Sequence, residues 1–325
     1  MRRDRRSGRR WARAAFAAVL GAGAAVVVLP DRLRIDHDVP LVDAVPWRPH
    51  TSLAALGAAG LLAGRPATRP TGIAVGAVAV AGLASVAPRA VRRPRRDPET
   101  VALTIMTANV LKGSADAGAL AAVVMRERPD LVVLPEAGAD YRDKLMPLLG
   151  ESGYRSWTSS LIDRRDARGV TLLAAPAAGD LHVRPGTGMR MRHVEASGGV
   201  LGLRPLYAVH TSAPMRRRFA RAWCRELDLI RSWTSAPIAP IVVGDLNATL
   251  DHSRLRAALG GCRSAASGTG RGLVGTYPSS APRACGIQID HVLVPDGTVT
   301  SRFEIVDLPG TDHRAVLTTV HLPPA

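Results

Sequence analysis

The stretch "VVGDLNATL", residues 242–250, begins with a pair of β-branched residues and ends in residues typical of a turn. It sets Asp245 and Asn247 just beyond a short apolar run that predicts a buried β-strand. Taken alone, the pair is explained by an Asx turn. A carboxylate and a carboxamide at a strand end are also groups that bind a reacting ligand, so the choice depends on what the other strand ends carry.

From residue 101 onward, short apolar runs alternate with helical patterns. Strands are predicted over "VALTIMTANV" (101–110), "DLVVLPE" (130–136), "GVTLLAA", "LYAVHTSA", "IAPIVVGDLN", "QIDHVLV" and "RAVLTTVHL". Helices are predicted over "ADAGALAAVVMRERP" and "MRRRFARAWCRELDLIRSW". The alternation predicts a single α/β domain over residues 101–325, with strands supplying most of its core.

Polar side chains stand at or near the ends of these predicted strands. They are Asn109, Glu136, His210, Asp245, Asn247, Asp290, Asp312 and His313. Each one alone has an ordinary explanation, as a turn residue, a solvated strand end or a satisfied histidine. Loops from several strands converge on the functional sites of α/β folds, so their joint occurrence predicts one site.

The ordered motifs that hold these residues resemble the endonuclease/exonuclease/phosphatase family of DNase I-like metallophosphoesterases. The motifs are "TANVL", "DLVVLPE", "AVHTSAP", "VVGDLNAT", "TYP", "IDHVLV" and "GTDHRAV". The resemblance implies a four-layer α/β sandwich, with two β-sheets face to face and helices outside. It also implies hydrolysis of a phosphate ester or anhydride bond with a divalent metal, Mg²⁺ or Mn²⁺. Pro135, Leu246 and Thr311 stand where the family usually has Gln, Phe and Ser, but none of these removes a functional group.

The resemblance also implies roles for single residues. Glu136 is expected to be the principal metal ligand, with Asn109 close to the metal or to a phosphate oxygen. Asp312 is expected to add to the metal site. Mg²⁺ prefers oxygen ligands and keeps several waters, so this small oxygen set is sufficient for it.

The expected catalytic residues are His210, Asp245, Asn247, Asp290 and His313. Asp245 orients and deprotonates the attacking water, and Asn247 donates to a phosphate oxygen. His313 and Asp290 resemble a His–Asp pair, in which the carboxylate fixes the imidazole tautomer and raises its basicity. His210 hydrogen-bonds the phosphate or protonates the leaving group.

Two further features have ordinary structural explanations that we favour. His291 follows Asp290 directly and is expected to be structural rather than catalytic. The run "RRR" at 216–218 is expected to be an exposed face of an amphipathic helix, with contact to an anionic headgroup as the alternative.

The net charge of +16 is concentrated at the start of the 325-residue chain. Residues 1–100 contain 17 Arg against 7 acidic residues, a charge of +10, whereas residues 101–325 carry +6. Uncharged stretches lie between these arginines at about 14–30, 49–64 and 70–88. A bilayer span needs ~17–25 residues, so the third is adequate and the first two are marginal.

We therefore predict a membrane region over residues 1–88, a basic linker over 89–100 and a catalytic domain over 101–325. A cleaved secretory signal is the alternative for the first stretch. Seven Arg precede it, which favours a cytoplasmic N-terminus. Three spans then make this a multi-pass protein of the cell membrane with an extracytoplasmic catalytic domain. A Cys262–Cys285 disulfide fits that location, and two free thiols are the alternative.

The membrane region narrows the expected substrate. Three spans before such a domain resemble the actinobacterial membrane phosphoesterases associated with teicoplanin-type antibiotic resistance, the VanJ-like proteins. That resemblance implies membrane lipids as partners and a lipid phosphate, such as undecaprenyl pyrophosphate, as substrate. A surface-anchored Mg²⁺-dependent nuclease, with nucleic acid as partner, is the second hypothesis, and sphingomyelinase-like action is a variant of the first. The third is a scaffold with an inactive domain; no protein partner is inferred.

Overall fold

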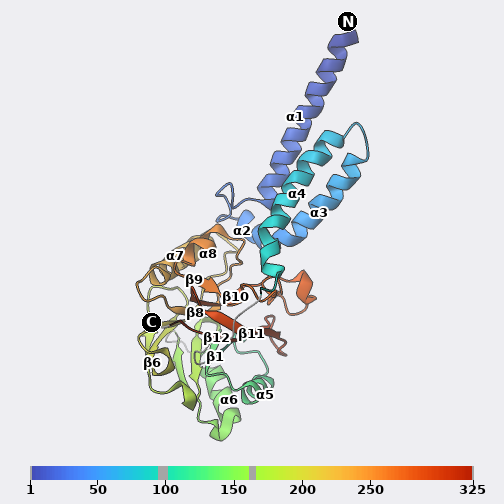
Figure 1. The fold of residues 1–325 in the computed structure, drawn as a ribbon. Coiled ribbons are helices and arrows are strands. Elements are labelled where there is room, and N and C mark those ends of the chain that lie inside the picture. Colours follow the sequence, from blue (N-terminus) through green and yellow to red (C-terminus); the bar gives the residue numbers. More distant parts are fainter. Residues whose placement is uncertain (1, 94–101, 161–165, 324–325) are drawn as a thin grey trace. The chain divides into compact units, whose positions relative to one another are not determined.

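The computed structural model describes residues 2–93, 102–160 and 166–323 (Figure 1). The chain forms two units, the first of Met1–Pro88 with Leu250–Ser253 and the second of Arg89–Thr249 with Arg254–Ala325. Residues 94–100 of the predicted linker, and residue 101 of the first predicted strand, lie outside the described residues.

The first unit is helical. Its elements are α1 (Arg2–Val28), α2 (Leu41–Ala44), a 3-10 helix (Val45–Trp47), α3 (Arg48–Ala63) and α4 (Arg69–Ala90, whose last two residues belong to the second unit). Among the described residues, two stretches are long and apolar enough to cross a membrane, Arg10–Val28 and Arg69–Ala90. Helix α3 has only 16 residues, so the predicted second span at 49–64, and with it the prediction of three spans, is not confirmed.

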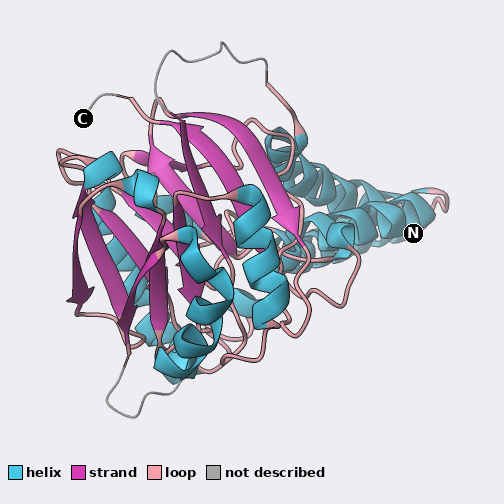
Figure 2. Cartoon of the chain, turned by 90° about the horizontal axis from the view of Figure 1, so that it is seen from below, coloured by secondary structure: helices cyan, strands magenta, loops and turns pink. Residues whose placement is uncertain are grey.

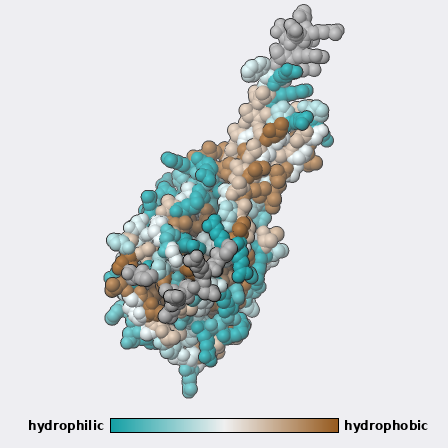
Figure 3. Space-filling model, viewed as in Figure 1, coloured by the Kyte–Doolittle hydropathy of each residue, from teal (hydrophilic) through white to brown (hydrophobic). Residues whose placement is uncertain are grey.

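The surface of these helices is rich in exposed apolar side chains (Figure 3). Phe16, Leu61 and Ile73 are 58%, 81% and 62% exposed. Helix α4 also packs closely against α3 at Gly72, where the absence of a side chain lets the two backbones approach. A Cβ atom at Gly72 would lie 2.6 Å from the Ala63 nitrogen, so no larger residue fits there. Small residues at helix contacts are typical of helices that pack inside a membrane.

The second unit contains two six-stranded mixed sheets. In spatial order, the first consists of β11 (Val299–Val306), β12 (Ala315–His321), β1 (Ala102–Thr107), β2 (Leu131–Pro135), β4 (Val170–Ala174) and β3 (Arg155–Ser159). The second consists of β5 (Leu181–Gly186), β6 (His193–Gly198), β7 (Leu206–His210), β8 (Ile241–Asp245), β10 (Asp290–Pro295) and β9 (Cys262–Ser264).

Among the described residues, the α-helices that accompany the sheets are α5 (Ala117–Glu127), α6 (Ala139–Leu149), α7 (Arg217–Thr234) and α8 (Ser253–Ala258, whose first residue belongs to the first unit). The 3-10 helices of this unit are Gly150–Ser152, Asp166–Arg168, Pro176–Ala178, Gly199–Leu201 and Arg283–Cys285. Asp116 caps α5, because its Oδ1 accepts the Ala119 N–H at 2.9 Å.

The sheets pack face to face around one apolar core, with helices outside (Figure 2). Ile105 and Leu131 of the first sheet share this core with Ala208 and Val243 of the second. A second apolar cluster joins the first sheet to α5 and α6. Full burial of one aliphatic side chain contributes about 1.5–3 kcal/mol, so these layers account for much of the stability. The predicted α/β sandwich is confirmed.

The directions of four strand pairs bring the polar strand ends to one edge of each sheet. Strands β1 and β2 are parallel, as are β7 and β8, so the residues that follow them emerge together. Strands β12 and β10 run antiparallel to β1 and β8, so both begin where their partners end. In the register of the second sheet, Asp245 pairs with His210 on one side and with Asp290 on the other.

The sequence patterns did not predict β3, β5, β6, β9 and β11 or helices α6 and α8. The three cysteines are free thiols, so Cys262 and Cys285 do not form a disulfide. Cys262 is buried in β9, where its Sγ donates to the Pro240 oxygen at 3.3 Å, and Cys285 is exposed.

Candidate active site

Asp245 is the centre of the polar cluster. It is the last residue of β8 and is 1% exposed. Its Oδ1 accepts the Asn247 N–H at 2.8 Å, and its Oδ2 accepts Asn109 Nδ2 at 3.0 Å. The same Oδ2 lies 3.8 Å from His210 Nε2 and 3.9 Å from His313 Nε2. One carboxylate thus contacts groups from four separate segments of the chain.

Asn109 connects Asp245 to Glu136. Its Nδ2 donates to Glu136 Oε1 at 3.1 Å as well as to Asp245, while its Oδ1 accepts the Leu111 N–H at 2.9 Å. The Leu111 N–H requires an acceptor, so the oxygen side of the amide faces the backbone and the nitrogen side faces the carboxylates. Glu136 Oε2 accepts the Lys112 N–H at 3.0 Å, which orients the second carboxylate.

The backbone at these strand ends adopts conformations that most residues avoid. Glu136 and Asn247 have φ values of 60° and 44°. Gly244 has φ 142°, and a Cβ there would lie 1.9 Å from the Val209 oxygen, so only glycine fits beside Asp245. Positive φ values at non-glycine residues persist where the surrounding structure holds them, and they concentrate at functional sites.

His313 and Asp290 form a buried pair beside Asp245. His313 Nδ1 lies 2.9 Å from Asp290 Oδ2, and the imidazole ring centre is 5.0 Å from that of Tyr277. Thr311 Oγ1 accepts the His313 N–H at 3.2 Å, so the hydroxyl orients the loop before β12. Asp312 Oδ1 lies 3.9 Å from His313 Nε2. The pair leaves Nε2 of the imidazole facing the other carboxylates.

Burial and like charges shift the protonation of these groups. Burial and then repulsion from Asp290 raise the pKa of Asp245 to about 6, against the opposing effect of His313 and His210. Burial disfavours the charged form of His313, but Asp290, Asp245 and Asp312 outweigh it and raise its pKa to about 10. The site therefore holds a concentration of buried negative charge around one imidazole.

The residues present fit a divalent metal ion. Asp245, Asp290 and His313 offer ligand atoms within 4.8 Å of one another. Asp290 Oδ1 and Asp312 Oδ1 are buried and have no hydrogen-bond partner among the described residues. Buried oxygens without partners require an explanation, and a hard cation such as Mg²⁺ or Mn²⁺, which prefers oxygen ligands, supplies one. Glu136, the predicted principal metal ligand, is outside this group of three and is connected to it through Asn109, whose Nδ2 donates to both Glu136 and Asp245.

The structure brings all eight predicted site residues together. Asn247 joins through its backbone N–H, and its Nδ2 donates to the Thr211 oxygen at 3.0 Å. His291 is 2% exposed and its Nε2 donates to the Ala248 oxygen at 2.8 Å, as expected for a structural role. Arg216–Arg218 are exposed, as the helical pattern predicts.

Tyr277 lies against the imidazole of His313, although no role was assigned to it from the sequence. Burial, Asp312 and Asp245 raise the pKa of its hydroxyl. The motif "TYP" was the available signal, because it stands in order with the others. The carbonyl of Thr211 carried no such signal, since backbone groups are not distinguished by sequence.

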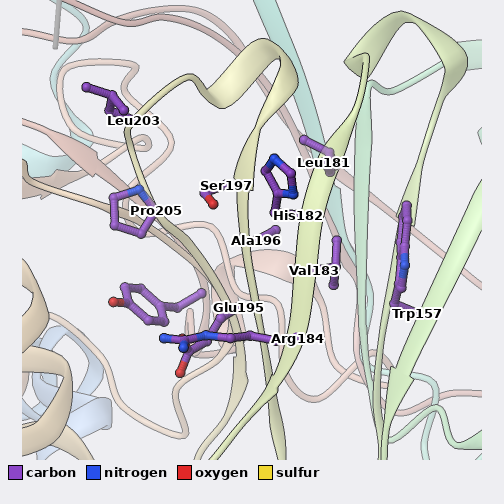
Figure 4. A pocket seen from close by; sticks show the side chains of 11 residues that line it. Trp157, Leu181, His182, Val183, Arg184, Glu195, Ala196, Ser197, Leu203 and Pro205 are labelled. Atoms are coloured by element: carbon purple, nitrogen blue, oxygen red, sulfur yellow. The ribbon is translucent and has the colours of Figure 1, made fainter.

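The second unit also has a pocket, shown with its lining side chains in Figure 4. It is lined by Trp157 and by residues of β5, β6 and β7. Arg184 and Glu195, two of its charged residues, form an ion pair at 2.6 Å. None of the eight site residues lines it.

A sandwich of two mixed sheets with buried carboxylates and histidines at one edge defines a metal-dependent hydrolase of phosphate bonds. The chain belongs to the Endonuclease/Exonuclease/phosphatase family, whose sequence model matches residues 106–313. Members of this family cleave phosphate ester or anhydride bonds and usually use a divalent metal, so this chain is a phosphoesterase-type hydrolase.

Solved structures share the fold over about two-thirds of this chain. The endonuclease/exonuclease/phosphatase from Beutenbergia cavernae is 19% identical, with a TM-score of 0.52 over 69% of this chain and 72% of its own. The corresponding protein from Bacteroides vulgatus is 13% identical, with a TM-score of 0.54 over 69% and 100%. The mannosyl-6-phosphatase Bt3783 from Bacteroides thetaiotaomicron is 13% identical, with a TM-score of 0.51 over 67% and 99%. Among curated proteins, none matches this chain.

Proposed function

We propose that this hydrolase is anchored in the cell membrane and cleaves a lipid phosphate such as undecaprenyl pyrophosphate, like the VanJ-like resistance phosphoesterases. The observation that carries the proposal is the presence of two helices able to span a bilayer in the same chain as the site. An enzyme held at the membrane meets headgroups at a high effective concentration. A hydrolase of lipid headgroups gains more from such an anchor than one that acts on free solutes.

The proposed topology places the catalytic unit outside the cytoplasm. Seven Arg precede the apolar part of α1, which favours a cytoplasmic N-terminus. An external catalytic unit needs an odd number of crossings, so α3 must cross as well as α1 and α4. Its 16 residues span about 24 Å, slightly less than a bilayer core of about 30 Å, and local thinning of the bilayer at modest cost accommodates that difference.

Labelling of cysteine in intact cells tests this topology. Cys285 is an exposed thiol of the catalytic unit, so a membrane-impermeant maleimide is expected to react with it before lysis. Cys285→Ser serves as the control and should lose that label. Reaction of Cys285 only after lysis would place the catalytic unit in the cytoplasm and would exclude an external substrate.

In the proposed reaction Asp245 orients the attacking water and accepts its proton, a task suited to a carboxylate whose pKa lies near 6. Asn247 donates the second hydrogen of its amide to a phosphate oxygen, because the first is bonded to Thr211. His210 hydrogen-bonds the phosphate or protonates the leaving group. His313, oriented by Asp290, stabilises the developing charge.

Glu136 is the proposed principal metal ligand, with Asp312 as an additional one. Asn109 lies near the metal or a phosphate oxygen and orients the Glu136 and Asp245 carboxylates. A bound Mg²⁺ or Mn²⁺ would neutralise phosphate charge in the transition state.

Phosphate release from undecaprenyl pyrophosphate by the full chain in detergent tests the substrate. Wild-type protein is expected to release inorganic phosphate, and Asn247→Ala and His313→Ala are each expected to reduce the release to a low residual rate. Asp228→Asn, an exposed change on α7, is the matched control and should keep wild-type activity. Parallel assays should measure phosphocholine release from sphingomyelin and nicking of plasmid DNA.

A surface-anchored nuclease is the second candidate, because the domain's net charge of +6 is compatible with a polyanionic substrate. The low aromatic content, 4% of the chain, argues against base stacking on a single strand. Nicking of plasmid DNA without release of phosphate from the lipid would favour the nuclease and contradict the lipid-phosphate proposal.

A further inference from the structure

Helix α7 turns two buried polar side chains toward the loops that hold the site. Trp223 is fully buried and Glu226 is 2% exposed. They are three residues apart and therefore lie on the same face of the helix. Neither belongs to the eight residues assigned to catalysis or metal binding, so their burial needs its own explanation.

Trp223 contacts the loop after β8. Its indole Nε1 donates to the Leu246 oxygen at 3.1 Å, within the buried interior. Leu246 stands between Asp245 and Asn247, and its own N–H donates to the Ile289 oxygen at 3.0 Å. The Leu246–Asn247 peptide group is therefore held by α7 through its oxygen, and the preceding Asp245–Leu246 peptide group is held by Ile289 through its N–H.

Glu226 contacts the loop after β7. Its Oε2 accepts the Ser212 N–H at 2.6 Å, and its Oε1 accepts the Ser212 hydroxyl at 3.1 Å and the Arg190 N–H at 2.9 Å. A buried carboxylate is costly unless it is paired or hydrogen-bonded. Three hydrogen-bond donors therefore satisfy both oxygens of the Glu226 carboxylate.

The two loops meet at Asn247. Its Nδ2 donates to the backbone oxygen of Thr211, the residue directly before Ser212. The Thr211 N–H in turn donates to the backbone oxygen of Asp245. The Thr211–Ser212 peptide group thus carries the acceptor for Asn247 on one end and the donor to Glu226 on the other. Its orientation determines the direction of the Asn247 amide.

We propose that Trp223 and Glu226 are positioning residues that hold the Asn247 amide in its reactive orientation from both sides. Asn247 has a φ of 44°, in the left-handed region that asparagine tolerates better than most residues, so its backbone fits this turn while its amide is held by the contacts above. Small displacements of a group that contacts the transition state are costly, of the order of 100-fold for ~1 Å. The inference rests on the proposed role of Asn247 in hydrolysis, but it concerns the support of that residue rather than the substrate.

The test is a double-mutant cycle in the full chain, with phosphate release from undecaprenyl pyrophosphate as the assay. Glu226→Gln replaces one oxygen with an NH₂ group, so at least one of the three hydrogen bonds is lost. It is expected to lower kcat about 10- to 100-fold with KM within about twofold, as is typical when the support of a catalytic group is removed. Trp223→Phe keeps an aromatic side chain but removes the N–H donor, and its smaller ring also leaves a cavity, so it should act in the same direction and also lower the thermal midpoint.

In an Asn247→Ala background, Glu226→Gln is expected to change the residual kcat by less than about twofold, because the group it positions is already absent. Equal fold-losses in both backgrounds would show that Glu226 does not act through Asn247. Asp228→Asn on the same helix is the control for α7 itself, and should leave kcat and thermal stability at wild-type values.

Amide hydrogen exchange of the full chain provides a measurement that needs no substrate. Glu226→Gln is expected to speed exchange at residues 211–213 and 246–249, with no change in β1. Unchanged exchange in both loops would overturn the inference. If the wild-type chain releases no phosphate from the lipid, the proposed substrate fails, while the exchange result still decides the role of Glu226.

Discussion

Replacing Asp245 with asparagine is expected to lower kcat for phosphate-bond hydrolysis about 10³- to 10⁴-fold while the protein stays folded. Asparagine has nearly the same shape but cannot accept a proton from water. It also loses one of the two oxygens that accept hydrogen bonds from Asn247 and Asn109. The variant therefore lacks the proton acceptor and also holds the neighbouring amides of Asn247 and Asn109 less firmly.

The measurement combines phosphate release with thermal unfolding of the same preparation. The variant should unfold at or near the wild-type midpoint, because it removes a buried negative charge that lies beside Asp290. Asp228→Asn makes the same chemical change at an exposed position and should be fully active. If Asp245→Asn kept more than a tenth of the wild-type kcat, Asp245 would not be the proton acceptor.

Removal of divalent metal should abolish activity and restoration should recover it. We expect dialysis against EDTA to reduce hydrolysis to the background rate, and Mg²⁺ or Mn²⁺ to restore it. The physical reason is the accumulation of carboxylates, of which Asp290 and Asp312 each have a buried oxygen atom without a hydrogen-bond partner in the described part of the chain. A cation removes their repulsion and neutralises the phosphate that binds there.

Binding of the ion has a second readout that does not depend on substrate. An ion that binds only the folded protein stabilises it by about 2.7 kcal/mol at 100 times its Kd. Mg²⁺ should therefore raise the thermal midpoint of the wild-type chain and raise that of Glu136→Gln much less. Full activity after exhaustive chelation, together with no shift in the midpoint, would contradict a metal-dependent reaction.

The strands that sequence patterns predicted are those with continuous apolar runs in the interior of the sheets. Strand β8, "IVVGD", is buried along its whole length and was identified from its composition. The missed strands have weaker patterns. Strand β9 has three residues, and β5 contains Pro185 and lies at a sheet edge. Such strands form because an adjacent strand supplies backbone hydrogen-bond partners. Their formation therefore depends on tertiary pairing more than on the local preference of their residues.

The N-terminal helices also combine features that the sequence predicts with features that only the structure shows. The spacing of the charged residues predicts three candidate spans, because arginine is costly inside a bilayer and a span must therefore lie between arginines. The lengths of the helices in the structure then distinguish the candidates. Arg48–Ala63 is a helix of only 16 residues, whereas Arg69–Ala90 has 22 and is long enough to cross a bilayer. The boundaries depend on where the chain turns, which the apolar composition does not encode.

The sequence by itself determined which chemical groups stand at the strand ends and in which order they occur. Asp245, Asn247 and His313 were identifiable because polar residues after apolar runs are conspicuous, and because their motifs resemble those of one family. Only the tertiary structure decided what these groups touch. Asn109 and Asp245 are 136 residues apart, yet their side chains meet at 3.0 Å because two sheets pack face to face with their polar edges together. Hydrogen bonds depend on distances of tenths of an ångström, and such distances arise from the packing of the whole core rather than from any local stretch.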